Sequence, residues 1–319
     1  MDWKVCLSVS SLTPETEKLV ELLRNKAVVD VVGLSGYSLE GYDIFIGKKM
    51  SEETLATADK LKTIFAYKTG VDDFPMKTLR ERGIRLVNSH ASAEYVAEYT
   101  LGLCFSLVNR ITESDRNLRK GKWYDTEKPY WKSLFGMKVG LLGYGNIGRK
   151  VHQLMERLGI PCVTLDRGKV YENIELADSV EALCDKTDLL VLSLPDTGAT
   201  DRMVNEAVLT HLEGKYIVNV GRSNCFDEEA LYNALRDGRL AGFASDTWDY
   251  KYKPSKSTEP WVKLSEYPFA ELDNVVISPH QATRVADGYG RYVFDVLRKV
   301  LRYIEDGILE GVVNLDKEY

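Results

Sequence analysis

The sequence lacks the features that would place the protein in a membrane or on nucleic acid. No stretch reaches the roughly 20 apolar residues that cross a bilayer, and no signal or transit pattern is recognisable. The formal net charge is −6, and no extended basic block is present. We therefore expect a cytoplasmic protein with neither a nucleic-acid partner nor a membrane partner.

The few cysteines of the chain argue against a disulfide framework and against a cysteine-bound metal site. The five cysteines are an odd number, and they lack the paired spacing of a metal site. Most of them lie within apolar or strand-like runs, which predicts buried, reduced thiols and no metal centre. These residues are Cys6, Cys104, Cys162, Cys184 and Cys225.

The 319 residues are enough for two domains, and the first part alternates strands with helices. Strand-like runs at 3–9, 27–33, 42–47, 61–67 and 84–88 are separated by helical segments at 13–25, 52–58 and 75–82. Thr13 suits the N-cap of the first helix and Pro14 its first turn, whereas Thr16 in place of Glu or Gln predicts no full capping box. This alternation predicts a parallel sheet covered by helices.

A long apolar helix is predicted over 93–111, followed by an irregular segment at 120–134. Six strand-like runs follow, at 137–143, 161–166, 188–195, 216–221, 241–246 and 274–280, which is enough for one doubly wound sheet. The chain then returns to a helical pattern, and residues 312–315 are strand-like. We therefore predict an α/β protein with a discontinuous first domain (1–98 and 284–319) and a second domain at 99–283.

Glycine is concentrated at one informative place in the second domain. Gly143, Gly145 and Gly148 lie between an apolar run and a helical pattern, and Asp166 ends the next apolar run. The first glycine permits a tight turn, the second permits close approach of a pyrophosphate, and the third permits close packing of helix and strand. The carboxylate suits the hydroxyls of a ribose. The pattern predicts a dinucleotide-binding domain.

Three polar residues follow three later strands of the same sheet. Arg222, Asp246 and His280 each come directly after, or at the end of, an apolar run. Ligands of parallel sheets collect at the carboxyl ends of the strands. We therefore expect these side chains at the cofactor edge of the sheet.

The order of these motifs resembles that of the D-isomer-specific 2-hydroxyacid dehydrogenases, over nearly the whole chain. The matching segments are KTGVDDF (68–74), RGIRLVN (82–88), VAEYTLGL (96–103), GLLGYGNIGRKV (140–151), LSLPDTGATDRMVN (192–205), VNVGRS (218–223), SDTW (245–248) and ISPHQA (277–282). The resemblance implies a Rossmann-type nucleotide domain beside a flavodoxin-like α/β substrate domain.

The resemblance also implies roles for particular residues. Arg222 would bind the carboxylate of a 2-keto acid and polarise its carbonyl, because a guanidinium keeps its charge and offers a bidentate fork. His280 would be the general acid in reduction and the base in the reverse direction. The backbone N–H groups of Gly70 and Val71 would also bind the substrate carboxylate.

The cofactor implied is NAD, because Asp166 would repel a 2′-phosphate. The nearby Arg167 and Lys169 leave NADP open. The residues expected to bind the cofactor are Thr100, Gly143, Tyr144, Gly145, Asn146, Ile147, Gly148, Asp166, Arg167, Leu194, Pro195, Thr200, Val220, Gly221, Asp246 and His280.

The sequence departs from the family at the acidic partner of the histidine. The family has a Glu followed by Pro five residues after the strand-end Asp, where this chain has Lys251. An insertion delays the Glu-Pro pair to Glu259-Pro260, so we assign Glu259 as the partner of His280, with Asp249 as the alternative. A neighbouring carboxylate would favour the imidazolium and orient the ring.

The sequence therefore predicts an oxidoreductase that interconverts a 2-keto acid and a D-2-hydroxy acid, assembled as a homodimer. Two alternatives are considered. One is an NAD(H)-sensing, corepressor-like binding protein, which belongs to a different functional class. The other is a related enzyme that oxidises phosphite. Glyoxylate, hydroxypyruvate, pyruvate and phenylpyruvate all remain open as substrates.

Overall fold

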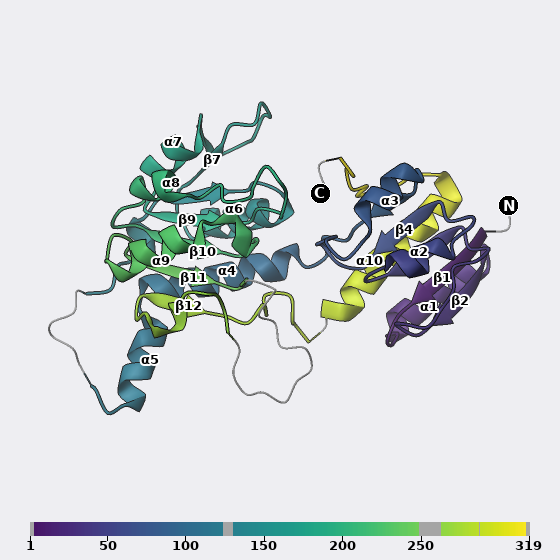
Figure 1. The fold of residues 1–319 in the computed structure, drawn as a ribbon, viewed down its shortest axis with the longest axis horizontal. Coiled ribbons are helices and arrows are strands. Elements are labelled where there is room, and N and C mark those ends of the chain that lie inside the picture. Colours follow the sequence, from purple (N-terminus) through teal and green to yellow (C-terminus); the bar gives the residue numbers. More distant parts are fainter. Residues whose placement is uncertain (1–2, 124–129, 249–262, 287, 317–319) are drawn as a thin grey trace. The chain divides into compact units, whose positions relative to one another are not determined.

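The chain forms two compact units in a computed structural model, which describes residues 3–123, 130–248, 263–286 and 288–316. Unit 1 contains residues 1–92 and 284–319, and unit 2 contains residues 93–283 (Figure 1). The first boundary lies at residue 92 where residue 98 was predicted, so the start of the long helix belongs to unit 2. None of the described helices is long and apolar enough to cross a membrane.

Unit 1 is a five-stranded parallel sheet with helices on both faces. Its strands are β1 (Trp3–Ser8), β2 (Ala27–Val32), β3 (Ile44–Gly47), β4 (Thr63–Ala66) and β5 (Arg85–Val87). Its helices are α1 (Pro14–Arg24), α2 (Glu52–Ala56), α3 (Met76–Glu81) and α10 (Gly288–Asp306). The strand order β2-β1-β3-β4-β5 is that of flavodoxin, which confirms the predicted fold class.

Alternate residues of the unit 1 strands point to opposite faces, and each face carries its own core. On one face Val5 and Phe65 pack in a cluster with residues of α1 and α10, among them Val296. On the other face Phe45 packs with residues of α2 and α3. As predicted, the C-terminal segment rejoins this unit: Val313 N–H donates to Leu86 O at 2.8 Å.

The first helix of unit 1 corrects one prediction. Thr13 caps α1, because its hydroxyl accepts the N–H of Thr16 at 3.3 Å. The Thr16 hydroxyl in turn accepts the N–H of Thr13 at 2.7 Å, so a full capping box is present. The prediction of no capping box was wrong because a threonine hydroxyl reaches the N-cap N–H as the Glu or Gln side chain does.

Unit 2 is a doubly wound sheet of seven parallel strands. Its strands are β6 (Val139–Leu142), β7 (Cys162–Leu165), β8 (Glu175–Ala177), β9 (Leu189–Leu192), β10 (Tyr216–Asn219), β11 (Gly242–Ser245) and β12 (Val275–Ile277). Its α-helices are α4 (Ala93–Val108), α5 (Ile111–Arg119), α6 (Asn146–Arg157), α7 (Val180–Asp185), α8 (Glu206–Thr210) and α9 (Glu228–Arg236). Within the described part of this unit, single turns of 3-10 helix, η1 (Leu134–Gly136), η2 (Ser223–Cys225) and η4 (Phe269–Glu271), lie in the connections.

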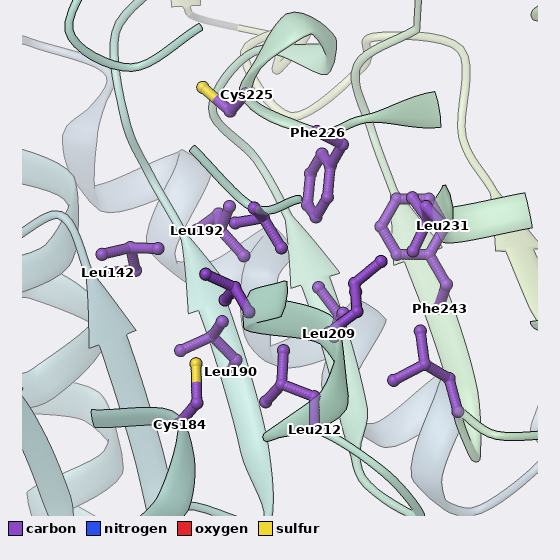
Figure 2. Packing of buried hydrophobic residues seen from close by; sticks show 14 of the residues in the cluster. Leu142, Cys184, Leu190, Leu192, Leu209, Leu212, Cys225, Phe226, Leu231 and Phe243 are labelled. Carbon is purple, nitrogen blue, oxygen red and sulfur yellow. The ribbon is translucent and has the colours of Figure 1, made fainter. Parts of the chain in front are cut away.

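The strand order of unit 2 fixes where a ligand can bind. The order β12-β11-β10-β9-β6-β7-β8 reverses direction between β6 and β9, as in a Rossmann fold. Ligands of such sheets bind at the carboxyl ends of the strands at this reversal. Figure 2 shows the core on one face, where Leu190 and Leu192 of β9 pack with Leu209, Leu212 and Phe243. The alternate residues of the same strands face α4 and α6.

The long apolar helix is shorter than predicted. It ends at Val108, and α5 begins at Ile111 after Arg110 adopts φ +56°. A left-handed residue cannot continue a right-handed helix, so the chain changes direction there. Figure 1 shows α5 pointing away from the sheet of its own unit.

Candidate active site

The glycine-rich loop has the geometry of a dinucleotide-binding turn. Gly143 follows β6 with φ +109°, a conformation that favours glycine. A Cβ on Gly148 would lie 2.0 Å from the carbonyl oxygen of Gly143, whereas a Cβ on Gly145 would meet nothing within 4 Å. The fold itself requires glycine at 143 and 148. At 145 the protein leaves open space, which fits close approach by a ligand.

The N-terminus of α6 adjoins this space. Gly145 is the N-cap, no side chain caps the helix, and no acidic residue occupies its first turn. The N–H groups of Asn146, Ile147 and Gly148 lack carbonyl acceptors within the helix, and the helix dipole adds partial positive charge there. This arrangement fits a pyrophosphate.

Ser193 supports the loop and was missing from the predicted site. Its hydroxyl donates to the carbonyl oxygen of Gly143 at 2.9 Å. It also lies 2.8 Å from where a Cβ of Gly143 would be. Its position directly after β9, beside the end of β6, is the signal that could have identified it.

Tyr144 is held by its own neighbours. Its hydroxyl lies 2.6 Å from Nδ1 of His152, and its ring meets Tyr171 edge-on with centroids 4.8 Å apart. Burial raises the pKa of the Tyr144 hydroxyl above its ordinary value. The contact joins the glycine-rich loop to the segment that follows Asp166.

Asp166 and Arg167 lie exposed after β7. The Asp166 N–H donates to Ala177 O at 2.8 Å, which fixes the backbone beside β8. One carboxylate oxygen, Oδ1, accepts the N–H of Gly168 at 2.8 Å. The carboxylate is therefore oriented by its own turn at the carboxyl edge of the sheet.

The loop after β9 packs against the loop after β10. Leu194 and Val220 are buried, and a Cβ on Gly221 would lie 2.6 Å from the carbonyl oxygen of Leu194. The Thr200 hydroxyl donates to Pro195 O at 2.7 Å. This hydrogen bond stabilises the loop after β9. The predicted contact of Thr200 with the cofactor stays a prediction.

Thr100, which was also predicted to contact the cofactor, makes its hydrogen bond within its own helix. Its side chain is fully buried in α4, and its hydroxyl donates to Val96 O at 2.6 Å. The predicted cofactor contact of Thr100 stays a prediction, with its donor already engaged.

The register of the sheet brings the predicted polar residues to one edge. Asn219 of β10 pairs with Ser245 of β11, which pairs with Ile277 of β12. Arg222 and His280 therefore leave β10 and β12, the two parallel strands on either side of β11, at the same end of the sheet. The Arg222 guanidinium is half-buried, and its Nη1 donates to Gly221 O at 3.1 Å.

Asp246 holds the segment that carries His280. Its Oδ1 accepts the Ser278 hydroxyl at 2.5 Å and the Gln281 N–H at 2.8 Å. Its Oδ2 accepts the Ala282 N–H at 3.0 Å. The carboxylate is buried, with 1% of its surface exposed, and His280 between these donors adopts φ +57°. The hydrogen bonds fix a backbone conformation that a histidine rarely adopts.

Two further side chains complete this support and were not predicted. The Tyr99 and Ser278 hydroxyls are 2.8 Å apart, and Trp248 Nε1 donates to Ser278 O at 3.1 Å. The two predicted partners of the histidine, Glu259 and Asp249, lie outside the described residues.

In unit 1, the predicted substrate loop follows β4. Val71 is buried and Gly70 is half-buried. Among the hydrogen bonds found in the described part of the chain, none uses the N–H of Gly70 or Val71 as a donor. The binding of an anion by these two groups stays a prediction.

Comparison with known proteins identifies the family. The NAD-binding-domain model of the D-isomer specific 2-hydroxyacid dehydrogenases matches residues 101–282. The chain belongs to this family.

Individual relatives agree with this identification. A D-3-phosphoglycerate dehydrogenase from Methanocaldococcus jannaschii is 29% identical over 95% of this chain, which spans 58% of that protein. Glyoxylate/hydroxypyruvate reductase A of Arabidopsis thaliana is 30% identical over 84% of this chain, which spans 79% of that protein. A crystal structure from Pyrococcus horikoshii OT3 matches with a TM-score of 0.80 and 29% identity, covering 100% of this chain and 96% of that one.

The family identity confirms three predictions: the α/β fold class with two parallel sheets, a nicotinamide dinucleotide as cofactor, and a dehydrogenase of 2-hydroxy acids. It does not favour the corepressor-like alternative. Along the described residues of this dehydrogenase, no group of three or more His, Cys, Asp or Glu side chains is arranged to hold a metal ion.

Proposed function

We propose that this dehydrogenase reduces a 2-keto acid to the D-2-hydroxy acid through Arg222 and His280, and catalyses the reverse reaction with the same residues. The observation that carries the proposal is their shared edge: both follow strands of one parallel sheet at the same end as the glycine-rich loop, and a buried carboxylate fixes the segment of His280. The bound nicotinamide supplies or accepts the hydride.

The charged side chain and two backbone groups share the work of binding the substrate. The Arg222 guanidinium binds the carboxylate and polarises the carbonyl that is reduced. The N–H groups of Gly70 and Val71 donate to the same carboxylate. Holding one anion from several donors fixes the carbonyl carbon for hydride transfer.

His280 moves the proton. In reduction its imidazolium donates a proton to the carbonyl oxygen, and in oxidation its neutral ring accepts the hydroxyl proton. Glu259 is the proposed partner that stabilises the imidazolium, and Asp249 is the alternative. We expect Glu259→Gln to shift the activity of keto-acid reduction toward acidic pH, because loss of a neighbouring carboxylate lowers the pKa of the histidine.

Asp166 supports NAD as the preferred cofactor. Its carboxylate is exposed at the end of β7 and oriented by Gly168 N–H. A carboxylate there accepts hydrogen bonds from ribose hydroxyls and repels a 2′-phosphate. We expect Asp166→Ser to weaken discrimination against NADPH, with Arg167 helping to bind the added phosphate.

The substrate is proposed to be a small, polar 2-keto acid. Glyoxylate and hydroxypyruvate appear in the names of several relatives, including the reductases of Arabidopsis thaliana and Thermotoga maritima. The same two acids are therefore the first candidates for this chain.

A second copy of this chain is the proposed partner of unit 2. The groove between α4 and α6 is lined by apolar Ala97, Leu101 and Leu154 and flanked by charged side chains, of which Glu94 and Lys150 pair with each other at 2.9 Å within the chain, and such a surface suits a two-fold interface. Exposed apolar side chains on and after α5 would be covered in such a dimer, and light scattering of the purified protein measures its mass. These side chains are Ile111, Leu118, Trp123, Tyr130, Trp131 and Phe135.

The deciding experiment follows NADH and NADPH absorbance with a panel of 2-keto acids. We expect wild-type turnover of one or two acids, at least a hundredfold loss in His280→Ala, and normal turnover in His211→Ala. His211 is a matched control, because its Nδ1 lies 2.8 Å from Asp185 Oδ1, between the ends of α7 and α8 and before β9 and β10 begin. Tight NADH binding without turnover of any acid would overturn the proposal and favour the sensor.

A further inference from the structure

A polar stripe runs along α10, beside its apolar face. Val293, Val296 and Val300 are buried in the core of unit 1. Tyr292 and Asp295 are three residues apart, and Lys299 follows four residues later, so the three lie on one side of the helix. Polar side chains that lie beside a buried core are normally hydrogen-bonded to other groups of the protein.

Those partners are the residues that follow β5. The Ser89 hydroxyl donates to Asp295 Oδ2 at 2.6 Å. Lys299 Nζ lies 2.9 Å from the same oxygen and also donates to Asn88 O at 2.9 Å. Ser89 is fully buried and Asn88 is 6% exposed. The carboxylate therefore fixes a buried hydroxyl, and the ammonium fixes the adjacent carbonyl.

The same two residues hold the loop after β4. Asn88 Nδ2 donates to Thr69 O at 2.8 Å, and the Thr69 hydroxyl donates to Ser89 O at 2.9 Å. Ser89 N–H donates to Lys68 O at 3.0 Å. Three hydrogen bonds thus end on the two residues before Gly70.

Tyr292 adds a second attachment to the same segment. Its hydroxyl donates to the Ser92 hydroxyl and lies 3.4 Å from the Thr69 hydroxyl. The backbone before Gly70 is therefore held at Lys68 and at Thr69.

We propose that Asp295 is a positioning residue for substrate binding: through Ser89 it sets the direction of the Gly70 and Val71 N–H groups. This inference rests on the proposed function, in which those groups bind the substrate carboxylate. Replacing the carboxylate by a neutral amide, or deleting the Ser89 hydroxyl, weakens or removes this buried hydrogen bond and loosens the loop, so affinity for the keto acid falls while affinity for NADH is unaffected.

The test compares Ser89→Ala and Asp295→Asn with Glu305→Gln. The control removes the same charge from the same helix, where Glu305 pairs with Lys26 at the surface. We expect the KM for the keto acid to rise about tenfold in both test variants, with kcat and the KM for NADH within about twofold of wild type and of the control.

A double-mutant cycle separates positioning through this hydrogen bond from general destabilisation. If Asp295 acts through Ser89, the Ser89→Ala/Asp295→Asn variant raises KM no further than the worse single variant. Additive effects, or equal losses in KM for both substrates, would overturn the proposal.

Two measurements remain informative whatever the turnover. Hydrogen exchange should be faster at residues 68–71 in both test variants and unchanged in the control. Oxalate, a simple carboxylate probe, should bind more weakly to both in calorimetry with NADH present. If the wild type reduces no keto acid, the proposed function fails, and unchanged oxalate affinity would then overturn this inference separately.

Discussion

At the scale of single residues, the glycines of the dinucleotide loop divide into two kinds. Gly148 is required by the protein, because a Cβ would lie 2.0 Å from Gly143 O. Gly145 is required only by a ligand, because its Cβ would meet open space. The sequence motif alone does not separate these roles, and substitution does.

We expect Gly145→Ala to retain the stability of the protein and to lose the cofactor. Its free energy of unfolding should fall by less than about 1 kcal/mol, the cost of alanine at an N-cap. NADH affinity should fall at least about tenfold, as the Cβ occupies the approach of the pyrophosphate. Gly148→Ala should instead lose about 1–3 kcal/mol of stability by overpacking.

Urea unfolding of the apoprotein and NADH titration by fluorescence measure both effects. Wild-type NADH affinity in Gly145→Ala would contradict the assignment of the open space to the cofactor. Unchanged stability in Gly148→Ala would contradict the packing.

Buried thiols make the stability of the protein sensitive to alkaline pH. Burial raises the pKa of Cys104 to about 12, from an ordinary value of 9.0. The folded state keeps the neutral thiol, whereas the unfolded chain ionises near pH 9. The contribution of the neutral Cys104 thiol to the free energy of unfolding is therefore complete below pH 9 and is lost as the pH rises from 9 toward 12.

Urea unfolding at pH 8 and pH 10 tests this expectation in wild type and Cys104→Ala. The wild type should lose about 1 kcal/mol more than the variant between the two pH values. The comparison of differences removes the cost of the cavity left by alanine, since that cost is present at both pH values. Equal losses would show that Cys104 does not carry the effect.

At the scale of elements, the β11–β12 edge is organised by one buried carboxylate. Asp246 accepts hydrogen bonds on both sides of His280. In Asp246→Asn one acceptor becomes an NH₂ group that faces an existing donor. We expect kcat to fall about a hundredfold or more, because misplacing a proton donor by about 1 Å costs that much.

The affinity for NADH separates two roles of Asp246. A residue that positions the histidine segment changes kcat and leaves NADH affinity near wild type. A residue that contacts the nicotinamide, as the family resemblance implies, weakens NADH binding as well. Isothermal titration beside steady-state kinetics decides between them, and Ser278→Ala should reproduce a smaller part of the kcat effect.

The sequence predicts these elements well where one strong local signal decides. The apolar runs at 137–143, 216–221 and 274–280 located β6, β10 and β12, because buried parallel strands are apolar throughout. These runs needed no tertiary information to be recognised.

Other elements depend on contacts that the sequence pattern does not display. β8 has only three residues, Glu175 to Ala177, and is defined by pairing with β7 at the sheet edge. The end of α4 at Val108 is followed by the left-handed Arg110, and neither glycine nor proline marks this position in the sequence. The hydrogen bonds to Asp246 require the left-handed backbone of His280, which only the folded loop determines.

At the scale of the whole molecule, the two units differ in how the chain builds them. The sheet of unit 2 lies within residues 93–283, and α4, α6 and residues of α7, α8 and α9 cover its two faces. Unit 1 takes α10 from the far end of the chain. One face of its sheet is covered by α10 through Val293, Val296, Leu297 and Val300.

This asymmetry predicts different behaviour of the separated pieces. Residues 93–283 should fold cooperatively and bind NADH within about tenfold of the full-chain affinity, because the core and the dinucleotide loop are complete there. Residues 1–92 alone should not fold, because five buried apolar side chains of α10 are missing and each contributes about 1.5–3 kcal/mol of burial. Adding residues 284–319 as a separate peptide should restore folding.

Circular dichroism, urea unfolding and NADH titration of the three preparations measure these outcomes. Gly145→Ala in the 93–283 piece is the control for specific binding, since it should keep the fold and lose the cofactor. A folded 1–92 piece would show that α10 is not needed to close the core of unit 1. An unfolded 93–283 piece would show that the nucleotide unit depends on its neighbour for stability, and the NADH affinity of the whole chain would then report on both units together.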